Sequence, residues 1–237
     1  MNFEEKIDKI KSLIIEINDV DYFPNQEDIR NITHYSLYQH TENYLFGMLQ
    51  SEEFFELTNF REKIDSKSNS EDIEIKKFNY DGFLKDGYFT KYFVSVETHI
   101  RHIASFYESS AGNIDVISIK KTFENLTNTK QSTLFTSLSS QDKDTFNFFC
   151  YLRNTMHNIG FQNDNNSDQT LIIHDKESKI ETNQTELKLK TGKPNNIDLI
   201  KLLLLNEQIF KLIQKINSLI PETDFIKHKL VDIGFNG

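Results

Sequence analysis

The chain is poor in the residues that interrupt or cross-link a fold. It has one cysteine, three prolines, eight glycines and no tryptophan among its 237 residues. A single thiol, Cys150, excludes an internal disulfide and a zinc site built on several cysteines, and it fits a reducing compartment. The scarcity of proline and glycine favours long helices over an architecture with many turns. The 20 phenylalanines, together with isoleucine and leucine, are expected to build the core.

Long apolar runs are absent as well. The longest, residues 202–205, is far too short to span a bilayer, which takes about 20 residues in a helix. The first ten residues, MNFEEKIDKI, mix charges with helical apolar spacing and lack a basic segment followed by an apolar run, so they predict no signal peptide. We therefore expect a cytoplasmic protein with no membrane segment.

Positive charge is in deficit. The formal net charge is -9 and the mean hydropathy is -0.54, which is typical of soluble proteins. This balance argues against a protein that coats nucleic acid, because such affinity comes mainly from Lys and Arg on phosphates. It leaves room for a small local basic site. The heavy use of Asn, Ile, Lys and Phe favours an AT-rich bacterial source.

Helical periodicity dominates the apolar pattern. We predict helices over 3–17, 25–49, 54–64, 88–107, 114–126, 140–160 and 197–219, with a short one at 224–232. Asn25, Ser139 or Ser140, and Asn195 or Asn196 are the expected N-caps of three of them, because their side chains accept hydrogen bonds from the first backbone amides of a helix.

Two segments depart from this pattern. Residues 65–82 are polar and mixed, which predicts a loop with a short strand at most. Residues 170–190 alternate between apolar and polar, as in Leu187 and Leu189, which is typical of a β-hairpin with one buried face. The predicted fold is mainly α: a helical bundle with a small β-hairpin inserted before the last long helix. Residues 1–80 form either an N-terminal helical extension or part of the same bundle, and residues 81–237 form the main domain.

One helix carries the residues best suited to chemistry. Arg153 and His157 are four residues apart, so they share a helix face that continues the apolar stripe of Phe146, Phe149 and Cys150. Arginine offers a permanently charged fork for phosphate oxygens, and histidine transfers protons near neutral pH. The structural alternative is that Arg153 pairs with a carboxylate and that His157 caps the end of the helix.

The run Arg153-Asn154-Thr155-Met156-His157-Asn158-Ile159-Gly160 resembles the signature of the HEPN superfamily, whose members are helical bundles. The order of elements from about residue 88 to residue 220 is similar too. The resemblance implies a metal-independent ribonuclease that forms a homodimer and acts as a toxin or a stress or phage-defence effector with a neutralising partner. It makes Arg153, Asn154 and His157 the catalytic residues and Asn158 a binding or orienting one.

A second polar cluster lies on the helix that, as the resemblance implies, faces this motif. Glu97 and Arg101 have the spacing of a helical ion pair, and either orients His157 or contacts RNA, or both simply form a surface pair. His99 and His102 have no further ligand nearby, so we predict no metal site, and we predict no cofactor.

Three alternatives therefore remain open. The chain is an endoribonuclease of HEPN type, a catalytically inactive HEPN-fold module for dimerisation or for binding nucleotides or RNA, or a plain helical scaffold in which the motif is coincidental. The three residues between Arg153 and His157 are fewer than the superfamily usually has, and together with the acidic charge they favour the second function. The presence of Arg153, Asn154 and His157 together favours the first.

Overall fold

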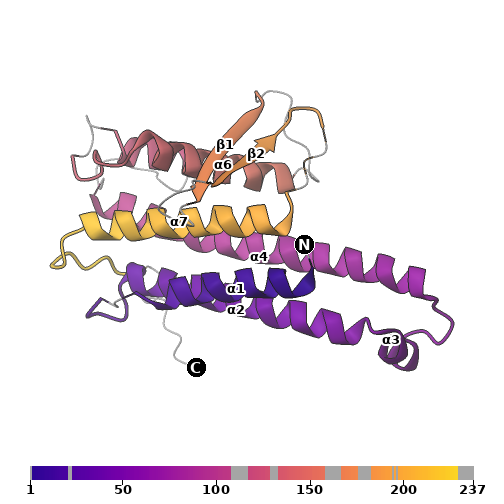
Figure 1. Cartoon of the computed structure of the whole chain (residues 1–237). Coiled ribbons are helices and arrows are strands. Elements are labelled where there is room, and N and C mark those ends of the chain that lie inside the picture. Colours follow the sequence, from indigo (N-terminus) through magenta and orange to yellow (C-terminus); the bar gives the residue numbers. More distant parts are fainter. Residues whose placement is uncertain are drawn as a thin grey trace.

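A computed structural model describes residues 2–20, 23–107, 117–128, 133–157, 167–175, 183–193, 195 and 197–228. Within these ranges the chain is mainly helical, with one two-stranded hairpin before the last helix, as the sequence predicts (Figure 1). The elements are α1 (Phe3–Asn18), α2 (Ile29–Phe54), α3 (Leu57–Lys63), α4 (Ser70–Tyr107), α5 (Ile119–Leu126), α6 (Ser140–His157), β1 (Gln169–Asp175), β2 (Asn183–Leu189) and α7 (Leu199–Leu219).

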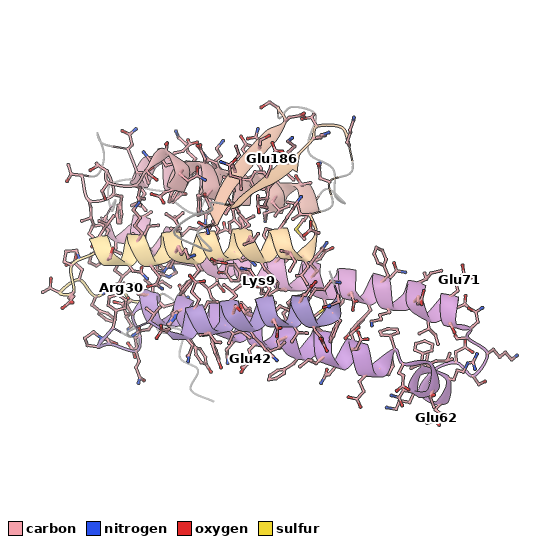
Figure 2. All side chains as sticks on the ribbon, viewed as in Figure 1. Lys9, Arg30, Glu42, Glu62, Glu71 and Glu186 are labelled. Carbon is pink, nitrogen blue, oxygen red and sulfur yellow. The ribbon has the colours of Figure 1, made fainter. Side chains whose placement is uncertain are left out.

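Helix α7 lies at the centre of the bundle and contacts α1, α4 and α6 (Figure 1). All four residues of its leucine run, 202–205, are buried, because neighbours surround the helix on several sides. At its edge Lys9 of α1 pairs with Glu207 of α7, with 3.3 Å between nitrogen and oxygen (Figure 2). One continuous hydrophobic core contains residues from α1 through to Ile226, so the first two helices share it with the rest of the chain.

Helix α4 differs from the prediction, which placed a loop or strand over 65–82. The helix begins at Ser70, because Asn69 and Asp72 cap its start reciprocally: the Asp72 amide donates to Asn69 Oδ1 at 2.9 Å. Only Ile73 is buried in the first four turns, so this part of the helix lacks the apolar stripe that identifies a helix in a sequence.

This first half of α4 forms an arm with the end of α2, and α3 closes the arm's outer end (Figure 1). Glu62 on α3 and Glu71 at the start of α4 lie at this end (Figure 2). The hydroxyl of Ser51 on α2 donates to Asp81 on α4 at 2.6 Å, and Glu52 pairs with Lys77. Side-chain polar bonds thus hold the two arm helices together where apolar burial is slight. The predicted helix over 54–64 is shorter than expected, because α2 runs on to Phe54 and α3 begins only at Leu57.

Two of the predicted caps are wrong. Helix α2 is capped by Asp28, whose carboxylate accepts from the Arg30 amide at 2.9 Å, whereas Asn25 accepts from the Glu27 amide in the preceding turn. Helix α7 is capped by Asp198. Asn195 instead accepts from the Lys190 amide at 2.7 Å and so shapes the loop after β2.

The expected cap at Ser139 is present, since its hydroxyl accepts from the Asp142 amide at 3.2 Å and starts α6. The predicted start of α5 at residue 114 and the end of α6 near Gly160 lie outside the described residues.

The hairpin confirms the alternation in the sequence. β1 and β2 are antiparallel, with Leu171 opposite Leu187, and both leucines are buried, whereas Ile172 and Glu186 are exposed. β1 contacts α6, so the hairpin covers the outer side of that helix (Figure 1). Residues 224–228 contain no helix, which contradicts the first part of the short helix predicted for 224–232. In the described part of the chain, no helix is long and apolar enough to cross a membrane.

Candidate functional site

Helices α4, α5 and α6 meet around a groove with a volume of about 450 Å³. It is lined by Phe93, Glu97 and Arg101 from α4, by Ser118, Ile119 and Lys120 at the start of α5, and by Cys150, Tyr151, Arg153 and Asn154 from α6. Four of the six residues that the sequence singled out therefore line one groove. The predicted facing of α4 and α6 explains this convergence.

The floor of the groove is set by aromatic packing between α4 and α6. The ring of Phe149 stacks on Phe93, with centroids 5.0 Å apart, and meets Phe89 edge-on at 5.3 Å. Cys150 is buried next to this contact, and burial, more than the nearby Glu97 carboxylate, raises the pKa of its thiol to about 12. The thiol is therefore a core group and not a nucleophile at neutral pH.

Arg153 lies half-buried at the edge of this packed region. Its guanidinium carbon is 5.5 Å from the centroid of the Phe93 ring, and its Nη1 donates to Asn154 Oδ1 at 3.4 Å. No carboxylate of the described residues lies within ion-pair distance of it. The alternative in which Arg153 pairs with a carboxylate therefore finds no support in this part of the chain, and Arg153 lines the groove.

Glu97 and Arg101 form the helical ion pair that their spacing predicts. Arg101 Nε and Nη2 donate to Glu97 Oε1 at 3.0 and 2.8 Å, and Nη1 donates to the Ile117 carbonyl at 3.2 Å. The bond to the Ile117 carbonyl fixes the backbone just before α5. The pair thus borders the groove and also positions the segment that brings Lys120 to it.

Lys120 and Tyr151 are site residues that sequence reasoning missed. The ammonium of Lys120 donates to the Tyr151 hydroxyl at 2.8 Å and lies 4.6 Å from the centroid of the Tyr151 ring. Thirty-one positions separate the two residues, and their contact depends on how α5 docks on α6. The sequence feature that bears on Lys120 is Ser118, a residue type that favours N-caps. It caps α5 and so places Lys120 in the first turn of that helix.

The remaining two predicted site residues are His157 and Asn158. His157 is the last residue of α6, one turn beyond Arg153, and its side chain lies outside the described residues. Asn158 also lies outside them. The approach of the His157 imidazole to Arg153 therefore stays a prediction.

The two histidines on α4 do not join the groove. His99 is buried, with Nδ1 3.1 Å from the hydroxyl oxygen of Thr33 on α2, and the His102 ring stacks on His228 at 4.7 Å. No group of three or more His, Cys, Asp or Glu side chains that could hold a metal ion exists in the described ranges.

The charges around the groove are mostly positive, in contrast to the whole chain. The lining carries three cations, on Arg101, Lys120 and Arg153, and one carboxylate, on Glu97. A second carboxylate, on Glu124, lies outside the lining and 3.9 Å from the Lys120 ammonium. Such a cluster at a concave surface suits a ligand that carries at least one negative charge, and guanidinium groups match the geometry of phosphate oxygens. Comparisons with protein-family models, with curated proteins and with solved structures find no match to the chain.

Proposed function

We propose that the protein is a metal-independent endoribonuclease of HEPN type, and that the groove between α4, α5 and α6 binds the scissile phosphodiester. The guanidinium of Arg153 carries this proposal, since it has no carboxylate partner among the described residues and lines a groove that Lys120 also lines. The Phe93 ring holds this half-buried cation without using its N–H donors, so most of the fork is left for an anionic ligand.

The chemistry assigns a role to each residue. Arg153 binds two phosphate oxygens with its fork, and Lys120 adds charge from the facing wall. His157 accepts the proton of the ribose 2′-hydroxyl, whose oxygen attacks phosphorus while the bond to the 5′-oxygen breaks. The products are a 2′,3′-cyclic phosphate and a 5′-hydroxyl. Asn154 and Asn158 orient the reacting groups by hydrogen bonding.

A homodimer completes this site. The departing 5′-oxygen needs a proton, and His157 of a second copy, protonated as the imidazolium, donates it when a two-fold axis runs near α6. We extend the proposal to the biological role: a cytoplasmic toxin or a stress or phage-defence effector that a neutralising partner holds in check.

The experiment is an RNA cleavage assay in the presence of EDTA. We expect wild-type protein to cleave single-stranded RNA to 2′,3′-cyclic phosphate ends, and Arg153→Ala to lose this activity. Lys143→Ala is the matched control, because it removes a cation from the same helix outside the groove. Activity that requires added magnesium contradicts the proposed mechanism.

A second candidate follows from the short Arg153–His157 spacing. In that case the protein is an inactive HEPN-fold module that binds nucleotides or RNA without cleaving them. Binding of RNA that Arg153→Ala weakens, with no cleavage by wild type at any concentration, favours this candidate over the enzyme.

A further inference from the structure

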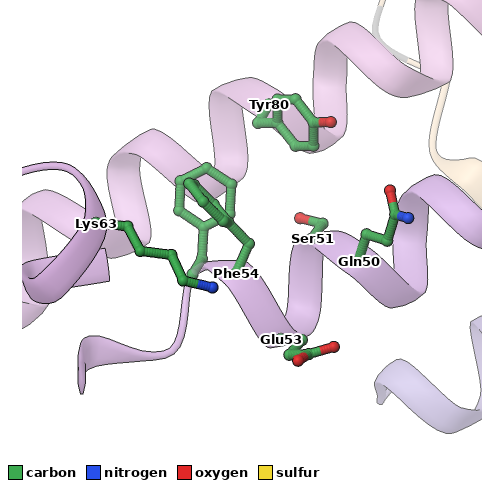
Figure 3. Close-up of a pocket in the computed structure, with 7 residues that line it drawn as sticks. Gln50, Ser51, Glu53, Phe54, Lys63 and Tyr80 are labelled. Carbon is green, nitrogen blue, oxygen red and sulfur yellow. The ribbon is translucent and has the colours of Figure 1, made fainter. Parts of the chain in front are cut away.

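A second cavity, of about 480 Å³, lies in the arm, where α2, α3 and α4 meet (Figure 3). Its wall contains three aromatic rings, those of Phe54 and Phe55 at the end of α2 and that of Tyr80 on α4. Gln50, Glu53 and Lys63 contribute polar groups. None of these residues borders the groove with Arg153, so the cavity is a separate feature of the molecule.

The rings of this cavity are held by one another. Phe55 lies 5.3 Å from Phe54 edge-on and 5.6 Å from Tyr80, and it stacks on the buried Phe60 at 5.5 Å. Phe54 and Phe55 are only half-buried. These rings are fixed by their packing on one side and are partly exposed on the other. They therefore offer a flat surface on which another ring can stack.

Three polar groups at the rim have no bonding partner among the described residues. The ammonium of Lys63, the hydroxyl of Tyr80 and the amide of Gln50 form no hydrogen bond or ion pair with any described residue. Figure 3 shows Lys63 extending toward Phe54, whereas the Glu53 carboxylate points away from the rings. The cavity therefore combines an apolar wall with one cation, on Lys63, neutral hydrogen-bonding groups, and one carboxylate, on Glu53, that points away from the rings. An apolar wall with a few polar groups is the usual make-up of a small-molecule site.

The positive charge of Lys63 determines which ligand charge the cavity favours. Three aromatic rings without it would suit a cation, since ring faces attract positive charge. A cation next to the rings disfavours that ligand and favours an anion instead. We propose that this cavity binds a small molecule with a planar aromatic ring and a negatively charged group, the ring stacking between Phe54 and Tyr80 and the charge pairing with Lys63.

Two probes with the same ring and opposite charges test the sign. 2-Naphthoate and 2-naphthylmethylammonium are both fluorescent, and the chain has no tryptophan to mask them, so anisotropy of the full-length protein reports binding directly. We expect naphthoate to bind more tightly. Nonspecific binding predicts the opposite order, because the protein carries a net charge of -9 and exposes Phe78 and Phe83 on the arm.

The matched variants are Lys63→Gln and Lys67→Gln, both at exposed positions where folding is little affected. Lys63→Gln should weaken naphthoate binding about fivefold, as expected for an exposed charge pair, and Lys67→Gln should leave it unchanged. Lys63→Glu should reverse the preference between the two probes. Equal effects of the Lys63→Gln and Lys67→Gln substitutions, or tighter binding of the ammonium probe to wild type, overturn the proposal.

A nucleotide and an aromatic carboxylate share this chemistry, and a third measurement separates them. Adenosine 5′-monophosphate is compared with adenosine by calorimetry in the same variants. Binding of the monophosphate that depends on Lys63 assigns the cavity to nucleotides, and binding of naphthoate alone assigns it to aromatic carboxylates. If neither anion binds, the proposal fails. These outcomes do not depend on RNA cleavage at the groove.

Discussion

The guanidinium of Arg153 lies over the ring of Phe93, 5.5 Å from its centroid, and this contact joins the end of α6 to the middle of α4. A ring face holds a guanidinium without using its N–H donors. The side chain is thus restrained in position, and apart from the bond of Nη1 to Asn154 its donors have no partner among the described residues and can bind a ligand in the groove. This relationship separates what Arg153 does for stability from what it does for binding.

Arg153→Ala should therefore lower RNA cleavage by at least about 100-fold, because a charge that faces the phosphate is lost. Its cost in stability should be about 1 kcal/mol, which is the scale of a partly exposed cation–π contact. Arg153→Lys keeps the charge and loses the fork, so it should retain partial activity at most. Initial rates and urea unfolding measured on the same preparations test both statements. A variant that cleaves as well as wild type excludes Arg153 from the site.

Much of the fold follows from local pattern. The stripe of α1 and the alternation in β2 identify those elements because one face of each is buried. The first half of α4 cannot be recognised in this way, because its partners, α2 and the short α3, bury little of it. Asn69 caps this half of the helix in the structure, and no apolar stripe follows it in the sequence.

From residue spacing alone, the site was predictable only where it depends on a single helix, because the facing of α4 and α6 came from the family resemblance. Glu97 with Arg101, and Arg153 with Asn154, lie at helical spacing, so their shared faces could be read from the sequence. Lys120 reaches the groove through the docking of α5 on α6, and no spacing rule reports such a long-range contact. Pairing across helices is therefore what the structure adds.

His157→Ala should abolish cleavage and barely change the unfolding temperature. His157 ends α6, so its truncation should cost at most about 1–2 kcal/mol, through lost dipole and capping interactions. Loss of a proton-transfer group lowers rates by about 100- to 10,000-fold. Single-turnover cleavage and thermal unfolding separate the two effects. Poor folding of the variant, with no cleavage by wild type, would identify the residue as a helix terminus only.

Tyr151→Phe should weaken RNA binding without removing any charge. The substitution removes the hydroxyl that accepts a hydrogen bond from the Lys120 ammonium at 2.8 Å. The lysine then loses the contact that positions it at the groove. We expect an affinity loss of up to about fivefold, typical of one hydrogen bond to a charged group near solvent. Lys120→Ala should lose more and should also reduce the salt dependence of binding. Titrations at two salt concentrations measure both, and equal salt slopes for the three proteins would contradict this role of Lys120.

The proposed dimer predicts that α6 lies next to its own copy. Sedimentation at high micromolar concentration should show a dimer, and a strictly monomeric species would count against it. Asp144→Cys, at an exposed position on α6, should form an intermolecular disulfide under mild oxidation. Asp8→Cys on α1 is also exposed and should not. The native Cys150 is buried and does not interfere.

The stability of the fold should depend on His99 below neutral pH. Burial lowers the pKa of His99 to about 4 from its ordinary value of 6.5. The unfolded chain therefore binds a proton between these two values that the folded chain does not, so stability is complete above about pH 6.5 and falls as the pH drops toward 4.

Between pH 7 and pH 5 this one group should remove about 2 kcal/mol from the free energy of unfolding. Burial also lowers the pKa of His34 and His228, so the wild type should lose more than this in total. His99→Gln does not titrate and keeps the remaining histidines. It should be less stable than wild type at pH 7, because the contact with Thr33 and the packing of the ring change, and yet it should lose about 2 kcal/mol less on acidification. Urea unfolding of both proteins at pH 7 and pH 5 gives the comparison. If the variant loses as much stability as the wild type, the proton taken up on unfolding belongs to another group.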